Sequence, residues 1–225
     1  MPIRHVSPKD TDMPESTADA VQLAIFAKAP IAGYAKTRLI PRLGPEGAAT
    51  LQAYLFQRTI RTALASPLRP ITLWCAPDCN NPIFRSARQE HGIATHVQVG
   101  DDLGERMFGA FELLTPRSPV LLIGTDCPIL SADYLTRCAT ALAGGADAAF
   151  IPAEDGGYAL IGLRRPVWRL FEGIPWGTGD VMRLTRDRLR EKHLSAFETD
   201  QLWDLDTPTD YDRAKSAALL SDPAA

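Results

Sequence analysis

The chain has 225 residues, of which 45% are hydrophobic, and a formal net charge of −3. This length and apolar content suit one well-buried domain, and the weak negative charge excludes a broad basic face of the kind that binds nucleic acid. The four cysteines are too few for a disulfide scaffold, and no apolar stretch reaches the roughly 18 residues that a membrane helix needs. We therefore expect a cytoplasmic protein that binds neither nucleic acid nor membranes, with a homodimer as an open option.

The first 20 residues differ in composition from the rest of the chain. They are rich in Pro, Ser, Thr and Asp and show no hydrophobic periodicity, which is typical of a disordered terminal arm. From residue 21 onward the pattern becomes regular. We predict a disordered arm over 1–20 and a single domain over 21–225.

Short apolar runs alternate with longer segments whose apolar residues recur at helical spacing. The runs predict strands over 21–27, 71–76, 94–99, 119–124, 147–152, 158–163 and 194–198. The longer segments predict helices over about 45–65, 80–91, 103–114, 131–143, 178–192 and 208–220. Alternation of this kind is typical of an α/β fold, here a three-layer α/β/α sandwich with a mostly parallel sheet.

Local signals refine this outline. Ser131, Thr178 and Thr207 each stand where a predicted helix begins, and are expected to be N-caps. The segment "AEDGG" separates the predicted strands 147–152 and 158–163 by a turn-forming sequence. A hairpin at this point would make one strand of the sheet antiparallel.

A cationic loop, "AKAPIAGYAKTRLIPRLG", follows the first predicted strand. Gly33 bends the loop, and Lys28, Lys36 and Arg38, with Thr37, supply positive charges and hydrogen-bond donors that suit a polyphosphate. The loop has neither the glycine spacing of a Walker A motif nor a GxGxxG motif. A solvated basic loop is the alternative, but ligands of open α/β sheets bind beyond the carboxyl ends of the strands, which favours a nucleotide phosphate site.

The segment "GDDLGERM" follows the third predicted strand. Asp102 and Arg106 are candidate nucleotide-binding residues within it. The alternative is a turn followed by a helix that Asp102 caps.

Two acidic segments predict a metal site. "LLIGTDCP" ends a fully apolar strand at Asp126, where a carboxylate is costly unless a cation pairs with it. "LWDLDTP" places Asp204 and Asp206 two residues apart, so that both point to one side if the segment is extended. Mg²⁺ or Mn²⁺ bound by Asp126 is the favoured interpretation, with either Asp206 or Asp204 as the second ligand and the other acid orienting a loop. A helix-entry role competes for Asp206.

Glu154 and Asp155 precede two glycines in "AEDGGYALIG". A carboxylate here could act as a general base or orient a metal ligand, and together with Lys36 these two residues are the candidate catalytic residues. A tight turn is the competing interpretation. In "GIPWGTGDV", the loop of Trp176, Gly177 and Thr178 could present a stacking face to a substrate or pack against the rim of the site.

Six segments together resemble a known family: "IFAKAPIAGYAKTRL", "GDDLGERM", "IGTDCP", "PAEDGGYALIGL", "GIPWGTGDV" and "LWDLDTPTDY". They are similar to a bacterial family of glycosyltransferase-like proteins related to the phospholactate guanylyltransferases and the molybdenum-cofactor guanylyltransferases. The resemblance, over residues 22 to about 215, implies a GT-A fold that binds a nucleotide and a divalent metal. Cys127 stands where a DxD motif would continue after Asp126, and the glycine-rich opening of the molybdenum-cofactor enzymes is absent.

Two reaction classes follow from these residues. A glycosyltransferase would take a nucleotide-sugar donor and use Asp155 or Glu154 to deprotonate a small acceptor. A nucleotidylyltransferase would take a triphosphate, stabilise charge at the α-phosphate with Lys36 and Arg38, and need no base. We predict sugar transfer, because of the "AEDGG" carboxylates, with nucleotidyl transfer as the alternative and a non-catalytic nucleotide-binding module as a third option.

Overall fold

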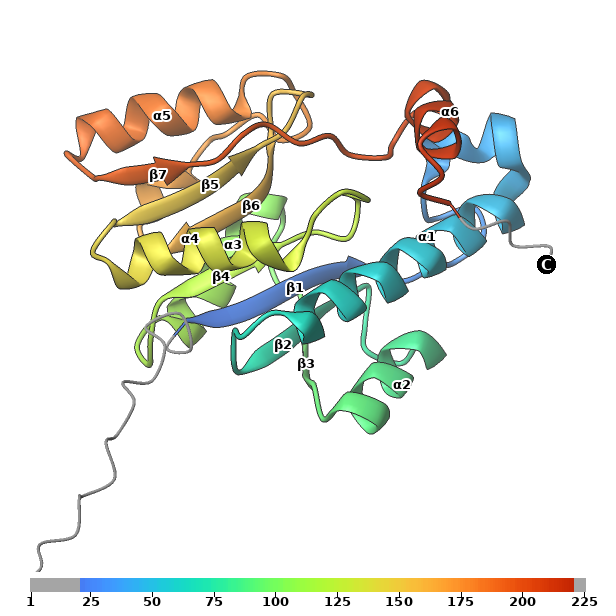
Figure 1. The fold of residues 1–225 in the computed structure, drawn as a ribbon, viewed down its shortest axis with the longest axis horizontal. Coiled ribbons are helices and arrows are strands. Elements are labelled where there is room, and N and C mark those ends of the chain that lie inside the picture. Colours follow the sequence, from blue (N-terminus) through green and yellow to red (C-terminus); the bar gives the residue numbers. More distant parts are fainter. Residues whose placement is uncertain (1–20, 221–225) are drawn as a thin grey trace, which may run out of the picture.

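The protein forms a single seven-stranded sheet flanked by helices (Figure 1). The structure, a computed structural model, describes residues 21–220, so the predicted arm over 1–20 lies outside the described residues. The strands are β1 Gln22–Lys28, β2 Ile71–Ala76, β3 Ala94–Val97, β4 Val120–Ile123, β5 Ala148–Pro152, β6 Tyr158–Leu163 and β7 Ala196–Glu198. The α-helices are α1 Ile40–Ala65, α2 Pro82–His91, α3 Leu103–Leu114, α4 Ala132–Ala143, α5 Val181–Glu191 and α6 Pro208–Ser216. Short 3₁₀ helices are η2 Thr37–Leu39 and η3 Trp168–Leu170.

The strand order is β3-β2-β1-β4-β6-β5-β7. Strand β6 is antiparallel to both of its neighbours, β4 and β5, while the other pairs are parallel. The predicted hairpin at "AEDGG" and the single antiparallel strand are therefore confirmed. Six strands end at the same edge of the sheet, which places the loops after β1 and β4 side by side.

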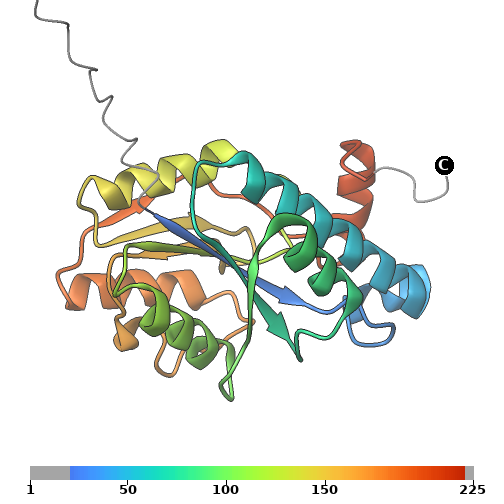
Figure 2. The same cartoon turned by 90° about the horizontal axis from the view of Figure 1, so that it is seen from below.

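Two separate apolar cores sandwich the sheet, as the three layers in Figure 2 show. Helices α1, α2 and α4 bury their apolar faces on one side, and α3 and α5 do so on the other. The predicted α/β/α sandwich is confirmed. No helix within residues 21–220 is long and apolar enough to cross a membrane.

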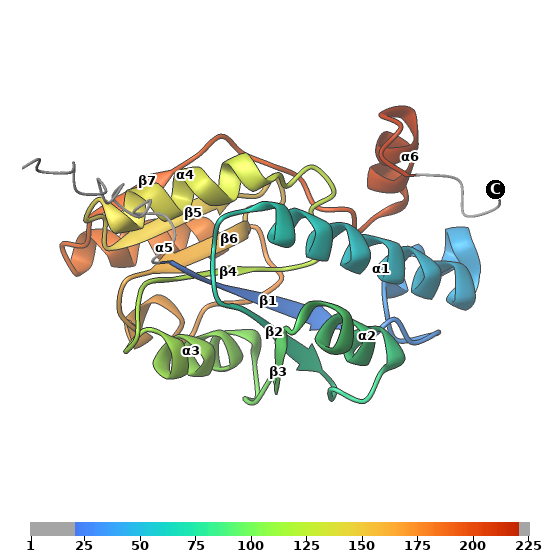
Figure 3. The same cartoon turned by 60° about the horizontal axis from the view of Figure 1, so that its bottom comes forward.

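A third, smaller core fixes the C-terminal segment. After β7 the chain runs past the end of the sheet to reach α6, which stands beside the first turns of α1 (Figure 3). Trp203 and Leu205 are buried there against Leu39, Leu51 and Leu55. This packing determines the direction in which Asp204 and Asp206, which alternate with the two buried residues, point their carboxylates.

The observed N-caps of the helices agree in part with those predicted from the sequence. Thr207 is the N-cap of α6 and forms a capping box with Asp210, as expected. Ser131 is the N-cap of α4 without a side-chain cap bond. The prediction for Thr178 was wrong: α5 begins after Asp180, because the Thr178 hydroxyl donates to the Pro175 carbonyl at 2.8 Å and closes a turn before the helix.

Gly156, in the β5–β6 turn, is expected to tolerate no side chain. Its φ is +88°, and a Cβ there would overlap the carbonyl oxygen of Gly179. We expect Gly156→Ala to lower the free energy of unfolding by about 3 kcal/mol or more, since strain and a backbone clash add. Gly173→Ala is the matched control, because Gly173 has a φ of +59° but no heavy atom within 4 Å of the added Cβ; about 1 kcal/mol is expected there. Urea unfolding measures both variants, and an equal loss of unfolding free energy in the two would contradict the predicted clash at Gly156.

Candidate functional site

A cavity of about 510 Å³ opens at the edge where the parallel strands end. It lies beyond the carboxyl ends of β1, β2 and β4 and the start of β6. Most of the residues expected to bind phosphate or metal line it: Lys28, Lys36, Thr37, Arg38, Arg106, Asp126, Asp204 and Asp206. The predicted cationic loop and the two predicted acidic segments thus meet in one place.

Lys36 is the centre of the cavity's charge network. Its Nζ lies 2.5 Å from Oδ1 of Asp126 and 2.7 Å from Oδ1 of Asp206, and its side chain is 3% exposed. The same Nζ donates to the carbonyl oxygen of Leu205 at 2.7 Å. The ammonium therefore has three oxygen partners that come from two distant parts of the chain.

The backbone brings these two acidic segments together. The amide of Leu205 donates to the carbonyl oxygen of Asp126 at 2.8 Å, which aligns the C-terminal segment with the end of β4. Burial of Trp203 and Leu205 turns the alternate residues, Asp204 and Asp206, toward the cavity. The expectation that both acids share one side of an extended segment is confirmed.

The crowding of carboxylates changes proton affinities. Burial, reinforced by the charges of Asp126, Asp155 and Asp206, raises the pKa of Asp204 to about 7. Burial alone would lower the pKa of Lys36, but Asp126 and Asp206 outweigh it and raise that pKa above its ordinary value, so the ammonium stays charged.

Cys127 takes no part in this charge network. Burial, with the charge of Asp204, raises the pKa of the Cys127 thiol to about 12. Cys127 is therefore a neutral thiol at physiological pH, at the position where a DxD motif would continue.

The acids around Lys36 have the chemistry of a divalent-metal site. Two carboxylate oxygens and a backbone carbonyl oxygen converge on one positive charge, and hard oxygen donors are the ligands that Mg²⁺ and Mn²⁺ prefer. Within residues 21–220, no cluster of three or more His, Cys, Asp or Glu side chains could hold a metal by itself. The residues present fit an ion that takes its remaining ligands from a phosphate and water.

The rim of the cavity is cationic. Lys28, at the end of β1, lies with its Nζ 5.4 Å from the ring centroid of Tyr34, whose side chain is exposed. Arg38 also lines the cavity. Arg106 donates from Nε to the carbonyl oxygen of Gly100 at 2.9 Å, which fixes the guanidinium at the start of α3. These three cations face the same space as Lys36.

Several cavity residues gave no sequence signal. Gln52 is buried in α1 and donates to the Thr125 hydroxyl at 3.0 Å. Gln98 donates from Nε2 to the carbonyl oxygen of Trp74 at 2.9 Å. Tyr158 lies at the start of β6, and its buried hydroxyl has no hydrogen-bond partner among residues 21–220. The sequence shows Tyr158 only as the first residue of an apolar strand, which does not single it out as a site residue.

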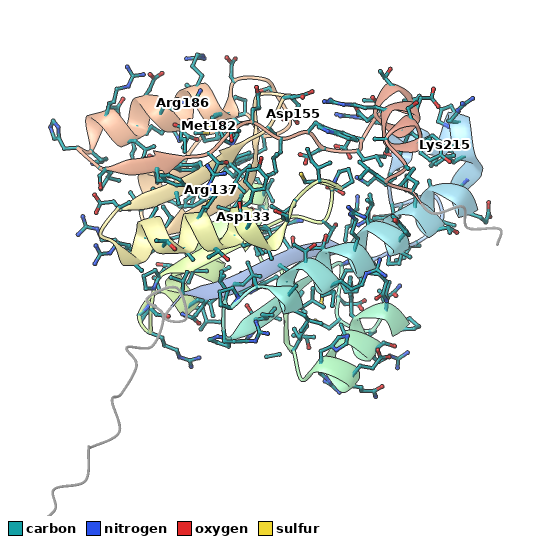
Figure 4. The ribbon with its side chains drawn as sticks, in the orientation of Figure 1. Asp133, Arg137, Asp155, Met182, Arg186 and Lys215 are labelled. Carbon is teal, nitrogen blue, oxygen red and sulfur yellow. The ribbon has the colours of Figure 1, made fainter. Side chains whose placement is uncertain are left out.

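Seven of the predicted site residues are absent from the cavity lining: Gly33, Asp102, Glu154, Asp155, Trp176, Gly177 and Thr178. Glu154 forms a two-armed ion pair with Arg213, at 2.7 and 3.1 Å. Asp155 accepts from the Gly157 amide at 2.8 Å in the β5–β6 turn, near the start of α5 (Figure 4). Asp102 caps α3 by accepting a hydrogen bond from the amide of Glu105. This geometry matches the alternative interpretation of the segment, a turn followed by a helix that Asp102 caps.

In the loop 175–179, the Trp176 side chain packs against the protein, whereas its neighbours in the loop are exposed. The Trp176 ring contacts Gly104 so closely that a Cβ at Gly104 would lie 2.8 Å from it. Trp176 also makes an edge contact with the Tyr158 ring, with the centroids 6.4 Å apart. Trp176 is half-buried and supports the wall behind Tyr158, as the rim-packing alternative expects, and its stacking role stays a prediction. Gly177 and Thr178, like Trp176, do not line the cavity.

Comparison with known proteins identifies the family. The family described as "Uncharacterized protein conserved in bacteria (DUF2064)" matches residues 59–178, more than half of the 225 residues. The chain belongs to this family. A solved structure from Desulfovibrio desulfuricans G20, proposed to be a nucleotide-diphospho-sugar transferase, has 30% identity and a TM-score of 0.79 over 86% of this chain and 85% of that chain. Among curated proteins, none matches the sequence.

Two further structures share the fold at lower identity. A nucleotidyl transferase from a Methanothermobacter species has 15% identity and a TM-score of 0.62, over 89% of this chain and 98% of that chain. Rv0371c from Mycobacterium tuberculosis H37Rv, in complex with manganese, has 18% identity and a TM-score of 0.51, over 86% and 97%. The expected GT-A fold is confirmed, and the expectation of a transferase agrees with these relatives.

Proposed function

We propose that the protein is a metal-dependent transferase that acts on a nucleotide-activated donor, and that nucleotidyl transfer is its reaction. The observation that carries this choice is the composition of the cavity. Lys28, Lys36, Arg38 and Arg106 line it, whereas Glu154 and Asp155, the carboxylates expected to serve as bases for sugar transfer, do not. A cavity that carries four cationic side chains and lacks both of these bases suits an acceptor that is already an anion.

The residues have separable tasks in this reaction. An oxygen of a phosphorylated acceptor attacks the α-phosphorus of a nucleoside triphosphate, the bond between α- and β-phosphates breaks, and pyrophosphate leaves. Arg38 and the lysines stabilise the charge that develops on the phosphate oxygens, and the cavity wall holds the two reactants in line. No proton has to be removed, because the acceptor phosphate is ionised.

Asp126 and Asp206 would hold the divalent ion. When bound, Mg²⁺ or Mn²⁺ neutralises the charge of the departing pyrophosphate. The convergence of both carboxylates on a single cation supports this assignment, and the manganese complex of Rv0371c is a precedent within the fold.

Sugar transfer is the second candidate. It is favoured by Asp204, a carboxyl group in the cavity whose pKa burial raises to about 7, where a general base is effective. In that reaction a hydroxyl of the acceptor would lose its proton to Asp204 and attack the sugar, and a nucleoside diphosphate would leave.

Product analysis separates the two reactions. The protein is incubated with Mn²⁺ and a panel of nucleoside triphosphates and phosphorylated small molecules, and in parallel with nucleotide sugars and hydroxyl acceptors. We expect pyrophosphate release that requires both a triphosphate and a phosphorylated acceptor. Release of a nucleoside diphosphate from a nucleotide sugar, with no pyrophosphate in the first panel, would establish sugar transfer in its place.

A further inference from the structure

The ammonium of Lys36 stands where the proposed metal ion would have its protein ligands. Its Nζ is within 2.7 Å of an oxygen of both Asp126 and Asp206. We propose that Lys36 and the divalent ion exclude each other: Lys36 neutralises the two acids in the metal-free protein, and entry of the ion releases the lysine toward the donor phosphates. This inference rests on the metal site of the proposed function.

Geometry makes joint occupancy unfavourable. Metal–oxygen bonds of Mg²⁺ are about 2.0–2.1 Å long, and Nζ lies 2.5 Å from Oδ1 of Asp126. An ion bound to that oxygen would therefore stand no more than about 5 Å from the ammonium, in a partly buried site where like charges repel strongly. The side chain of Lys36 is 3% exposed, whereas those of Asp126 and Asp206 are 44% and 41% exposed, so water screens this repulsion only in part.

The backbone of Lys36 is held in an uncommon conformation. Its φ of 48° and ψ of 45° lie in the left-handed region, which non-glycine residues seldom adopt. The ion pairs with the two acids and the bond to the Leu205 carbonyl are the contacts that fix its side chain. When an ion takes over the carboxylates, these side-chain contacts weaken, while the Lys36 carbonyl oxygen still accepts from the Leu39 amide at 2.8 Å.

The released ammonium has a destination in the same cavity. Thr37 and Arg38, the next two residues, line the cavity that Lys36 also lines. A donor phosphate bound to the ion offers Lys36 oxygens in exchange for the carboxylates that it loses. Metal and nucleotide should therefore bind cooperatively, and by linkage each should raise the affinity for the other by the same factor.

The test measures Mn²⁺ binding by electron paramagnetic resonance, without nucleotide. Lys36→Met keeps an unbranched side chain and removes the competing charge. We expect this variant to bind Mn²⁺ at least tenfold more tightly than the wild type, and to gain less Mn²⁺ affinity on addition of a non-hydrolysable triphosphate. Lys215→Met, on the outer helix α6 (Figure 4), is the matched control and should bind Mn²⁺ as the wild type does.

The outcomes separate this inference from the proposed function. Equal or weaker Mn²⁺ binding by Lys36→Met, with binding still detectable in both proteins, would overturn the exclusion and leave the metal site standing. If neither protein binds Mn²⁺ even with nucleotide, the metal site fails and the exclusion fails with it. Lys36→Gln repeats the measurement with a polar neutral side chain, so that a folding defect specific to methionine does not decide the result.

Discussion

Asp126→Asn is expected to reduce turnover of the nucleotide donor by about 10²–10³-fold, the usual cost of removing one electrostatic contact to a developing charge. The substitution keeps the shape of the side chain but removes a negative charge that faces the cavity. The proposed metal ion would lose an anionic ligand, while Asp206 would still hold Lys36. Because Asp126 would help to hold the ion that binds the donor phosphates, Mn²⁺-dependent nucleotide binding should weaken as well.

The measurement is the initial rate of product release under saturating donor, together with nucleotide affinity with and without Mn²⁺. Asp200→Asn is the control, because Asp200 is an aspartate whose side chain is 82% exposed and whose salt bridge to Arg137 is 3.9 Å long. It should leave both quantities unchanged. Wild-type rates in Asp126→Asn, or an equal loss in Asp200→Asn, would remove Asp126 from the metal site.

Hydrophobic periodicity predicted the sheet and its helices because each element buries a face that its own residues define. Strand β2, expected over 71–76, has those bounds in the structure. Helix α1 begins at Ile40 rather than near residue 45, since Gly44 adopts a left-handed φ of 70° and two helical segments join across it. A kink of this kind depends on packing at the helix start, which no local pattern describes.

The partners of the site residues could not be predicted in the same way. The sequence placed Lys36 among phosphate ligands, whereas the structure pairs it with Asp126 and Asp206, which follow it by 90 and 170 residues. Likewise, Glu154 is held by Arg213, which lies 59 residues away. Such pairings follow from the hydrogen bond between Leu205 and Asp126 and from the order of the strands. Sequence spacing alone carries no information about them.

Asp204→Asn is expected to stabilise the metal-free protein at pH 8, by at most about 4 kcal/mol. Burial and the neighbouring acids raise the pKa of Asp204 from 3.8 to about 7, and each pKa unit corresponds to about 1.4 kcal/mol. Between these values the folded protein binds the proton more tightly than the unfolded chain does. Wild-type stability therefore falls as the pH rises from about 4 through 7, and asparagine, which does not ionise, removes this loss.

Urea unfolding in the presence of EDTA, at pH 5 and pH 8, measures this effect. The stability gained by Asp204→Asn should shrink by more than half at pH 5, where Asp204 is protonated in the folded protein. Asp206→Asn is the contrasting variant: it leaves Lys36 with a single acid and should destabilise the protein. A gain that is the same at both pH values would show that shape, and not the ionisation of Asp204, sets the difference. A less stable Asp204→Asn at pH 8 would mean that Lys36 stabilises the ionised Asp204 enough to outweigh burial and the three neighbouring acids.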